Sequence, residues 1–241
     1  MGTRRYLAMT AAEFAAATSL SENIGWMACH FSPYNTGLCN LPGSLPPGSL
    51  LIVNDRIPLR GHDAGRISEQ LHQALEALRC GAVLLDFQQA STEARAMADH
   101  LASTLPCPVA VSEDCGQELN CPLFLSPCPH HTHLEEHIAP WYGRELWMDL
   151  ARDAQTLTLT KEGCRCCPLP LSEIPPEGHH DDRLCCHYRV ETGEDFARFS
   201  LWRTPADLDD LAQKAEGLGI QALVGLYQEL HDTNAEKHPS R

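Results

Sequence analysis

Seven short apolar segments recur within the first 150 residues of the chain, and amphipathic helical patterns separate several of them. In chain order these segments are Arg5–Thr10, Ile24–Phe31, Ser49–Asp55, Gly81–Phe87, Pro108–Ser112, Leu123–Ser126 and Glu145–Leu150. The clearest helical patterns are Asp63–Leu78 and Thr92–Leu105. Apolar strands that alternate with amphipathic helices are typical of a parallel sheet covered by helices. With seven strands before residue 150, the sequence predicts an α/β fold, a small TIM-type (β/α) barrel, and the second choice is a doubly wound open sheet.

The pattern changes after residue 150. Gln155–Thr160 alternates polar and apolar residues with a period of two, which is typical of an antiparallel strand. Leu184–Val190 and Phe196–Trp202 flank a short turn and predict a hairpin. We therefore expect a single α/β barrel domain over residues 1–241 that includes a Cys-rich antiparallel β excursion at about 151–203.

The last part of the chain begins with a strong helix start. Thr204 is a good N-cap, a proline and an acidic residue follow it, and the helix should run to about Leu218. The next segment, Gly219–Leu230, is compatible with a strand or with a second helix, and we favour the helix.

Charge and hydropathy narrow the classes of partner. The chain has 32 acidic and 18 basic side chains, a formal net charge of −14, and this acidity argues against nucleic-acid and anionic-membrane binding. It has no apolar run of about 18 residues, so no transmembrane helix is expected. The N-terminus is basic, but Glu13 and several hydroxyl residues interrupt its apolar part, which makes a poor signal peptide. We expect a cytoplasmic protein whose 12 Cys are reduced.

Polar side chains stand at the carboxyl ends of the predicted strands, where barrel enzymes keep their active sites. They are His30, Asn54, Asp55, Asp86, Gln88, Ser112, Glu113, Asp114, Ser126 and Asp149. Two carboxyl groups with different environments can act as general acid and base, and Asp86 with Glu113 is the best pair. An acidic residue after a strand can instead cap the next helix, and Asp55 and Asp114 are the strongest candidates for that role.

The segment Leu71–Gln88 (LHQALEALRCGAVLLDFQ) resembles the fourth helix–strand unit of chitinase-like glycoside hydrolases of family eighteen. In that family the strand reads roughly DGxDxDxE and often ends in LDFE. The strand Gly81–Phe87 is also the fourth in this chain, and Leu85–Gln88 (LDFQ) stands where LDFE would. The resemblance implies a glycosidase-like barrel with its site at the carboxyl ends of the strands.

The chain departs from the family motif where hydrolysis needs it most. In the family, the last carboxylic acid protonates the glycosidic oxygen, and the Asp two residues before it orients the substrate acetamide group that attacks. Here Gln88 replaces the acid, and Gly81 and Leu84 replace the two earlier Asp residues, so only Asp86 matches. Because an amide cannot donate a proton in this way, the resemblance implies sugar contacts by Asp86 and Gln88 without chitinase-type hydrolysis.

Cys and His residues gather in three clusters. They are Cys128, His130, His131, His133 and His137; Cys164, Cys166 and Cys167; and His179, His180, Asp181, Cys185, Cys186 and His187. Residues two apart in a strand share a face, so a structural zinc held by Cys164, Cys166, Cys185 and His187 is geometrically sensible. The alternative is a Cys-rich antiparallel flap with reduced thiols. We expect no other cofactor.

The sequence supports three functions. The first is a glycosidase-like barrel that binds or processes a carbohydrate or a similar polar small molecule at its mouth, through His30, Asp55, Gln88, Asp149 and Trp202, with Asp86 and Glu113 as catalytic residues if it is an enzyme. The alternative is a non-catalytic binding or assembly barrel, with the structural zinc. The third is a metal-dependent hydrolase. Dinucleotide, P-loop and esterase motifs (GxGxxG, GxxxxGK[ST], GxSxG) are absent from the sequence.

Overall fold

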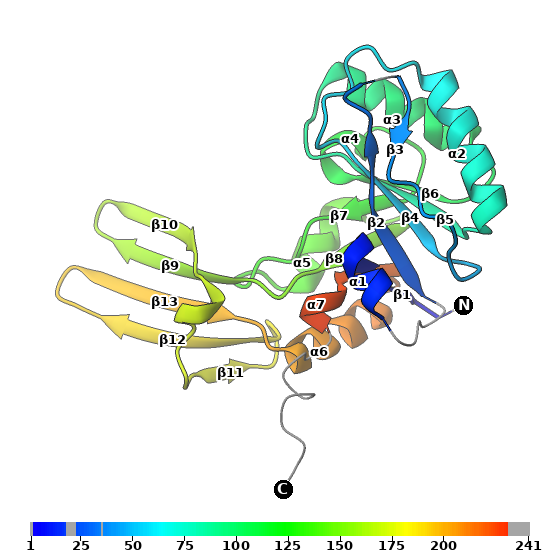
Figure 1. Ribbon diagram of the computed structural model, residues 1–241. Coiled ribbons are helices and arrows are strands. Elements are labelled where there is room, and N and C mark those ends of the chain that lie inside the picture. Colours follow the sequence, from blue (N-terminus) through cyan, green and yellow to red (C-terminus); the bar gives the residue numbers. More distant parts are fainter. Residues whose placement is uncertain (1, 18–22, 35, 231–241) are drawn as a thin grey trace, which may run out of the picture. The chain divides into compact units, whose positions relative to one another are not determined.

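The computed structural model describes residues 2–17, 23–34 and 36–230 (Figure 1). The chain divides into two compact units. The barrel unit is formed by Met1–Ser126, Gly143–Asp149 and Ile220–Tyr227, and the insertion unit by Pro127–Tyr142, Leu150–Gly219 and Gln228–Arg241. The single domain over 1–241 stays a prediction.

Eight parallel strands close into a barrel. They are β1 (Arg4–Met9), β2 (Ile24–Phe31), β4 (Leu50–Asn54), β5 (Ala82–Asp86), β6 (Val109–Ser112), β7 (Leu123–Leu125), β8 (Leu146–Leu150) and β14 (Ala222–Leu226). They are arranged around the barrel in chain order, and β1 pairs with both β2 and β14. This closure confirms the predicted TIM-type barrel, and the doubly wound open sheet is wrong.

The eighth strand corrects our preference for a helix in the last segment. Ala222–Leu226 is strand β14, and only Tyr227–Leu230 is helical (α7). In β14, Val224 pairs with Tyr6 of β1 and is buried. Without this strand, β1 and β8 would each leave a row of backbone groups without a partner in the sheet, so closure decides between the two conformations.

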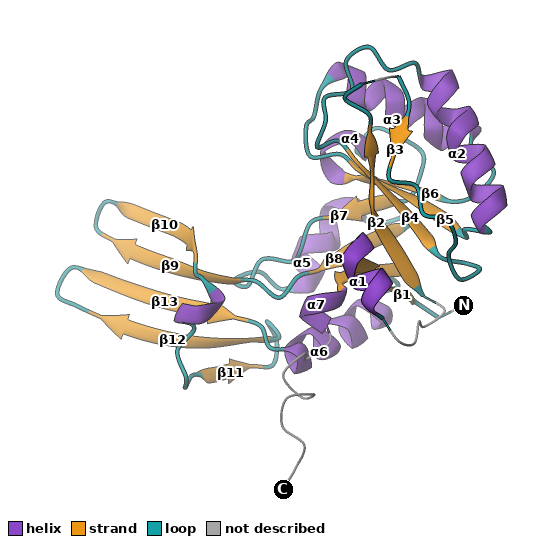
Figure 2. Cartoon of the chain, viewed as in Figure 1, coloured by secondary structure: helices purple, strands orange, loops and turns teal. Residues whose placement is uncertain are grey.

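Helices cover the outside of the barrel, as Figure 2 shows for the purple helices beside β4, β5 and β6. Their bounds are α1 (Ala11–Ala16), α2 (Ala64–Leu78), α3 (Thr92–Thr104) and α4 (Glu113–Gly116). Asp63 caps α2 and Ser91 caps α3 through side-chain bonds to backbone amides. The described part of the connection between β2 and β4 contains the short strand β3 (Leu38–Cys39), antiparallel to β2, and no helix.

Strand alternation gives the barrel unit two cores. One lies inside the barrel and contains Tyr6, Ala8, Leu50, Ile52, Ala82, Leu84, Ala110, Phe124, Trp147, Ala222 and Val224. The other lies between the strands and the helices, and Leu51, Val53, Val83 and Leu85 belong to it. Successive side chains of a strand point to opposite faces. A residue two positions after an inward side chain therefore also points inward. This rule determines which side chains at the strand ends reach the mouth of the barrel.

The insertion unit contains a five-stranded antiparallel sheet, which confirms the predicted β excursion. Its strands are β9 (Ala154–Thr160), β10 (Gly163–Pro168), β11 (His179–Asp181), β12 (Cys186–Thr192) and β13 (Phe196–Trp202), in the order β10-β9-β13-β12-β11. The same unit contains the helices α5 (Leu134–Ile138) and α6 (Pro205–Gly217) and the 3-10 helices η1 (Ala139–Trp141) and η2 (Leu171–Glu173). Within the described ranges, no helix has the length and apolar character needed to span a membrane.

A buried arginine ties the insertion unit together. Arg203 follows β13 and is 1% exposed. It donates to the carbonyl oxygens of Cys128 at 2.7 Å and Cys185 at 3.2 Å. Beside it lies His130, which is also 1% exposed and donates through Nε2 to the Asp153 carbonyl oxygen at 3.0 Å. His130 lies in a turn ahead of α5, and its ring is buried although the turn around it is polar.

Candidate functional site

The carboxyl ends of the barrel strands present a ring of polar side chains. Each of these side chains stands two positions after a residue of the interior core and therefore points inward. They are Thr10, Asn54, Asp86, Ser112, Ser126 and Asp149. The strands hold them in a fixed order, and Asn54 pairs directly with Asp86 across β4 and β5. Since enzymes and binding proteins of this fold use this end of the barrel, it is the candidate site.

Part of this end is hollow. A cavity of about 350 Å³ is lined by Thr10, Met27, Ala28, His30, Asn40, Asn54, Arg56 and Ile57. These residues come from β2, from the end of β4 and from the positions that follow β1, β3 and β4. The volume is at the lower end of the range of small-ligand sites, about 300–1,000 Å³.

Hydrogen bonds fix the polar walls of the cavity. Nδ1 of His30 donates to the Phe31 carbonyl oxygen at 2.8 Å, which leaves Nε2 to accept from the Asn40 amide at 3.1 Å. Asn54 donates to the carbonyl oxygens of Met27 at 3.3 Å and Cys29 at 3.1 Å, where the register between β2 and β4 shifts. Such bonds hold both side chains in one orientation before any ligand arrives.

Asp86 and Gln88 form a pair at the end of β5. The Gln88 side-chain amide donates to Oδ1 of Asp86 at 2.6 Å. Burial raises the pKa of the Asp86 carboxyl; the Gln88 bond opposes this rise, Asp55 adds to it, and Arg56 lowers the pKa. The pair offers a carboxylate oxygen as acceptor and an amide as donor and acceptor.

Asp55 stands behind this pair. It is 3% exposed, and its two oxygens accept the backbone amides of Gln88 and Gln89, each at 2.9 Å. Asp55 therefore fixes the backbone that carries Gln88, and its oxygens already have donors. Sequence reasoning gave Asp55 a ligand contact or a helix cap, because nothing in the sequence shows which amides a buried carboxylate meets.

Glu113 and Asp149 lie at the ends of other strands. Glu113 begins α4, and its Oε2 accepts from the Ser126 hydroxyl at 3.4 Å, across the ends of β6 and β7. Asp149 is half-buried on the inward side of β8. Asp86 accepts a hydrogen bond from Gln88, whereas Glu113 accepts one from Ser126. The predicted acid/base pair therefore shares one end of the barrel, but Glu113 interacts with a different neighbour.

Trp202 belongs to the insertion unit. It ends β13 and is 5% exposed, and its ring stacks on His187 with a centroid distance of 5.7 Å and an interplanar angle of 21°. Its faces are therefore largely covered by its own unit. A stacking role toward a sugar stays a prediction.

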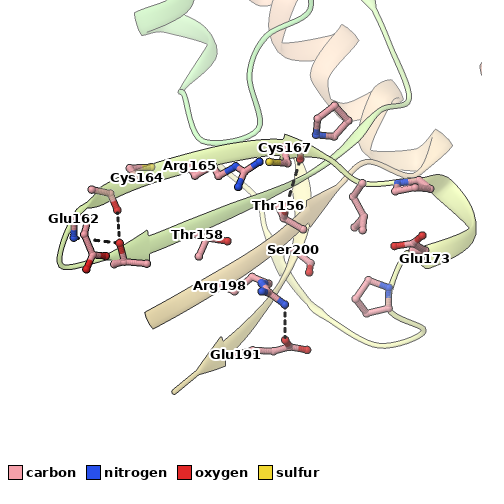
Figure 3. Close-up of a pocket in the computed structure, with 16 residues that line it drawn as sticks. Thr156, Thr158, Glu162, Cys164, Arg165, Cys167, Glu173, Glu191, Arg198 and Ser200 are labelled. Atoms are coloured by element: carbon pink, nitrogen blue, oxygen red, sulfur yellow. Dashed lines mark hydrogen bonds and ion pairs between the residues drawn. The ribbon is translucent and has the colours of Figure 1, made fainter. Parts of the chain in front are cut away.

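The antiparallel sheet carries a second hollow, shown in Figure 3. This groove of about 840 Å³ is lined by residues of β9, β10, β12 and β13, together with the segment from Pro168 to Pro175. Several of its polar groups already interact with one another: Arg198 lies 4.0 Å from Glu191, and Thr156 donates to the Cys167 carbonyl oxygen. The groove therefore offers fewer uncommitted groups than its size suggests.

The sheet order corrects the predicted zinc ligands. Cys164 and Cys166 lie on β10, whereas His187 lies on β12, and β9 and β13 run between these strands. At about 4.8 Å per strand step, β10 and β12 are roughly 14 Å apart. Cys164, Cys166, Cys185 and His187 therefore cannot bind one ion. The structure instead brings His187 close to His180 and Asp207.

No protein-family model and no curated protein matches the sequence. Solved structures do match its fold. The chitinase-like agglutinin from Robinia pseudoacacia has a TM-score of 0.62 at 10% identity, over 95% of this chain and 96% of that one. A glycoside hydrolase family 18 N-acetylglucosaminidase from Paenibacillus barengoltzii has a TM-score of 0.61 at 8% identity, over 96% and 97%. A mutant chitinase from Cycas revoluta, in complex with (GlcNAc)4, has a TM-score of 0.59 at 9% identity, over 97% of both chains. These matches confirm a chitinase-like fold.

Proposed function

We propose that the mouth of the barrel binds a carbohydrate and does not hydrolyse it by the chitinase route. The observation that carries this proposal is the hydrogen-bonded pair of Asp86 and Gln88 at the end of β5, next to Asn54 on β4. Carboxylate and amide groups in fixed positions are well suited to the paired hydroxyl and acetamide groups of an amino sugar. An ordered set of donors and acceptors also loses little entropy when a ligand binds.

The same pair argues against hydrolysis. Substrate-assisted cleavage needs a carboxylic acid to protonate the leaving oxygen, and Gln88 provides an amide in its place. Asp86 is held by that amide, and Glu113 is held by Ser126. The raised pKa of Asp86 comes from burial, so it does not by itself indicate an acid catalyst.

The fold comparisons support binding as a function of this scaffold. The Robinia protein is described as an agglutinin, and the Cycas protein is in complex with an N-acetylglucosamine tetramer. At 8–10% identity, these likenesses show the fold alone, so the choice of an amino sugar rests on the side chains at the mouth.

Calorimetric titration of the full chain with (GlcNAc)4 tests the proposal. Asp86→Ala should weaken binding at least about tenfold, because removing one charged hydrogen-bond acceptor costs about 1.5–3 kcal/mol. Asp114→Ala is the matched control, since Asp114 is an exposed carboxylate just after β6 and should leave binding unchanged. Equal binding by wild type and Asp86→Ala would contradict the proposal, provided that both unfold at the same temperature.

A further inference from the structure

Two histidines and a buried carboxylate meet in the insertion unit. Nε2 of His180 lies 2.9 Å from Oδ1 of Asp207, and Nδ1 of His187 lies 2.9 Å from Oδ2. The three ligand atoms lie within 4.8 Å of one another. Asp207 is 3% exposed, whereas both histidines remain partly open to solvent.

Secondary structure holds the three side chains in place. His180 and His187 are directly paired across β11 and β12, and their ring centroids are 4.9 Å apart. Asp207 is the third residue of α6, and Oδ2 also accepts from the Thr204 amide at 2.7 Å and the Thr204 hydroxyl at 2.8 Å. Oδ1 thus has His180 as its neighbour while the helix cap orients the carboxylate.

We propose that His180, His187 and Asp207 bind a divalent transition-metal ion, and that zinc is the ion that fits best. Two imidazoles and one carboxylate are a known zinc ligand set, with a water molecule in the fourth position. Metal–ligand bonds of about 2.0–2.1 Å in tetrahedral geometry place ligand atoms about 3.4 Å apart. The observed 2.9 Å contacts therefore need to open by about half an ångström.

A second carboxylate supports the assignment. Asp182 lies 3.0 Å from Nδ1 of His180, on the side of the ring opposite Asp207. Metal-binding histidines usually donate their other N–H to such a carboxylate, which fixes the tautomer and the ring orientation. A bound ion takes the place of any proton on Nε2 of His180, and that proton leaves to solvent.

The ion would join an edge strand to a helix. β11 has three residues and lies at the edge of the sheet, with β12 as its only strand partner among the described residues. A metal bond from His180 to Asp207 would attach β11 directly to α6. The proposal therefore predicts a structural role, and it does not depend on the ligand of the barrel mouth.

Zinc titration tests the site in the full chain. Exposed thiols are zinc ligands in general, so the exposed Cys164 and Cys166 are removed from the background by Cys164→Ser and Cys166→Ser. In that background, His180→Ala should lose one equivalent of bound zinc. His179→Ala is the matched control. The His179 side chain points to the face of β11 opposite His180, so this variant should keep the bound zinc. If the double-Ser background binds zinc with the same stoichiometry and affinity with and without His180→Ala, the proposal is overturned.

Two further readouts separate this site from the thiols. Cobalt in place of zinc should give an absorption spectrum of nitrogen and oxygen ligation that disappears with His180→Ala; a thiolate-to-cobalt band instead would overturn the assignment. Asp182→Asn should weaken binding by about 10–100-fold without removing it. Zinc should also slow amide exchange in β11, and unchanged exchange at saturating zinc would contradict the structural role.

Discussion

His130 is a buried base whose charge state the fold controls. Burial and the positive charge of Arg203 lower its pKa from 6.5 to about 4, against the opposing effect of Asp153. The ring is therefore neutral in the folded protein near neutral pH. Its Nδ1 is buried without a hydrogen-bond partner, so the protonated form has no acceptor there.

The free energy of unfolding should therefore depend on pH through His130. The unfolded chain takes up a proton below about pH 6.5, whereas the folded chain does so only near pH 4, so stability falls as pH drops through this window. The largest loss is about 3 kcal/mol. Urea unfolding at several pH values should show this slope in wild type and a weaker one in His130→Gln.

The exposed His72 provides the control for that measurement. His72→Gln should keep the wild-type slope, because its ring is exposed on α2. A slope that is the same in wild type and in His130→Gln would show that the buried ring is not the group responsible.

Among the elements, the loop after β5 has the clearest link to the site. Its backbone amides at Gln88 and Gln89 both depend on the buried Asp55 carboxylate. This loop carries Gln88, whose side chain contacts Asp86. A substitution that displaces the loop should therefore change carbohydrate binding as well as the free energy of unfolding.

Replacing Asp55 by Ala leaves two backbone amides without acceptors. We expect a loss of about 1–3 kcal/mol in the free energy of unfolding and weaker (GlcNAc)4 binding. Asp55→Asn keeps one carbonyl acceptor and should show a smaller loss in both. If Asp55→Ala binds as wild type does, the loop does not position Gln88 for the ligand.

The sequence predicted the elements unevenly, for physical reasons. Continuous apolar runs made the first seven barrel strands visible, and the cap at Thr204 marked the start of α6. The eighth strand was missed because an apolar run before polar residues fits both a strand and a helix face until its partner β1 is known.

The site shows the same limit. The place of Asp86 at the end of a continuous apolar run predicted that it lies at the mouth, because barrel sites lie at the carboxyl ends of the strands. The bonds of Asp55 and the meeting of His180 with His187 depend on register and on contacts between distant segments. A single sequence does not display such contacts.

At the scale of the whole molecule, the first and last barrel strands close the sheet together. A chain that ends at Gly219 lacks β14, which leaves β1 and β8 as open edges. We expect it to aggregate or to lose its cooperative unfolding transition. A chain that ends at Leu230 keeps every described strand and is the control, and equal transitions for the two would show that closure contributes little.

The central claim is that the barrel mouth holds a carbohydrate without cleaving it. Equilibrium dialysis of the full chain against (GlcNAc)4, with chromatography of the recovered sugar, tests both parts at once. We expect the protein to retain about one tetramer per chain and the recovered sugar to be intact. No retention of the tetramer, or recovery of shorter sugars that depends on Asp86, would contradict it.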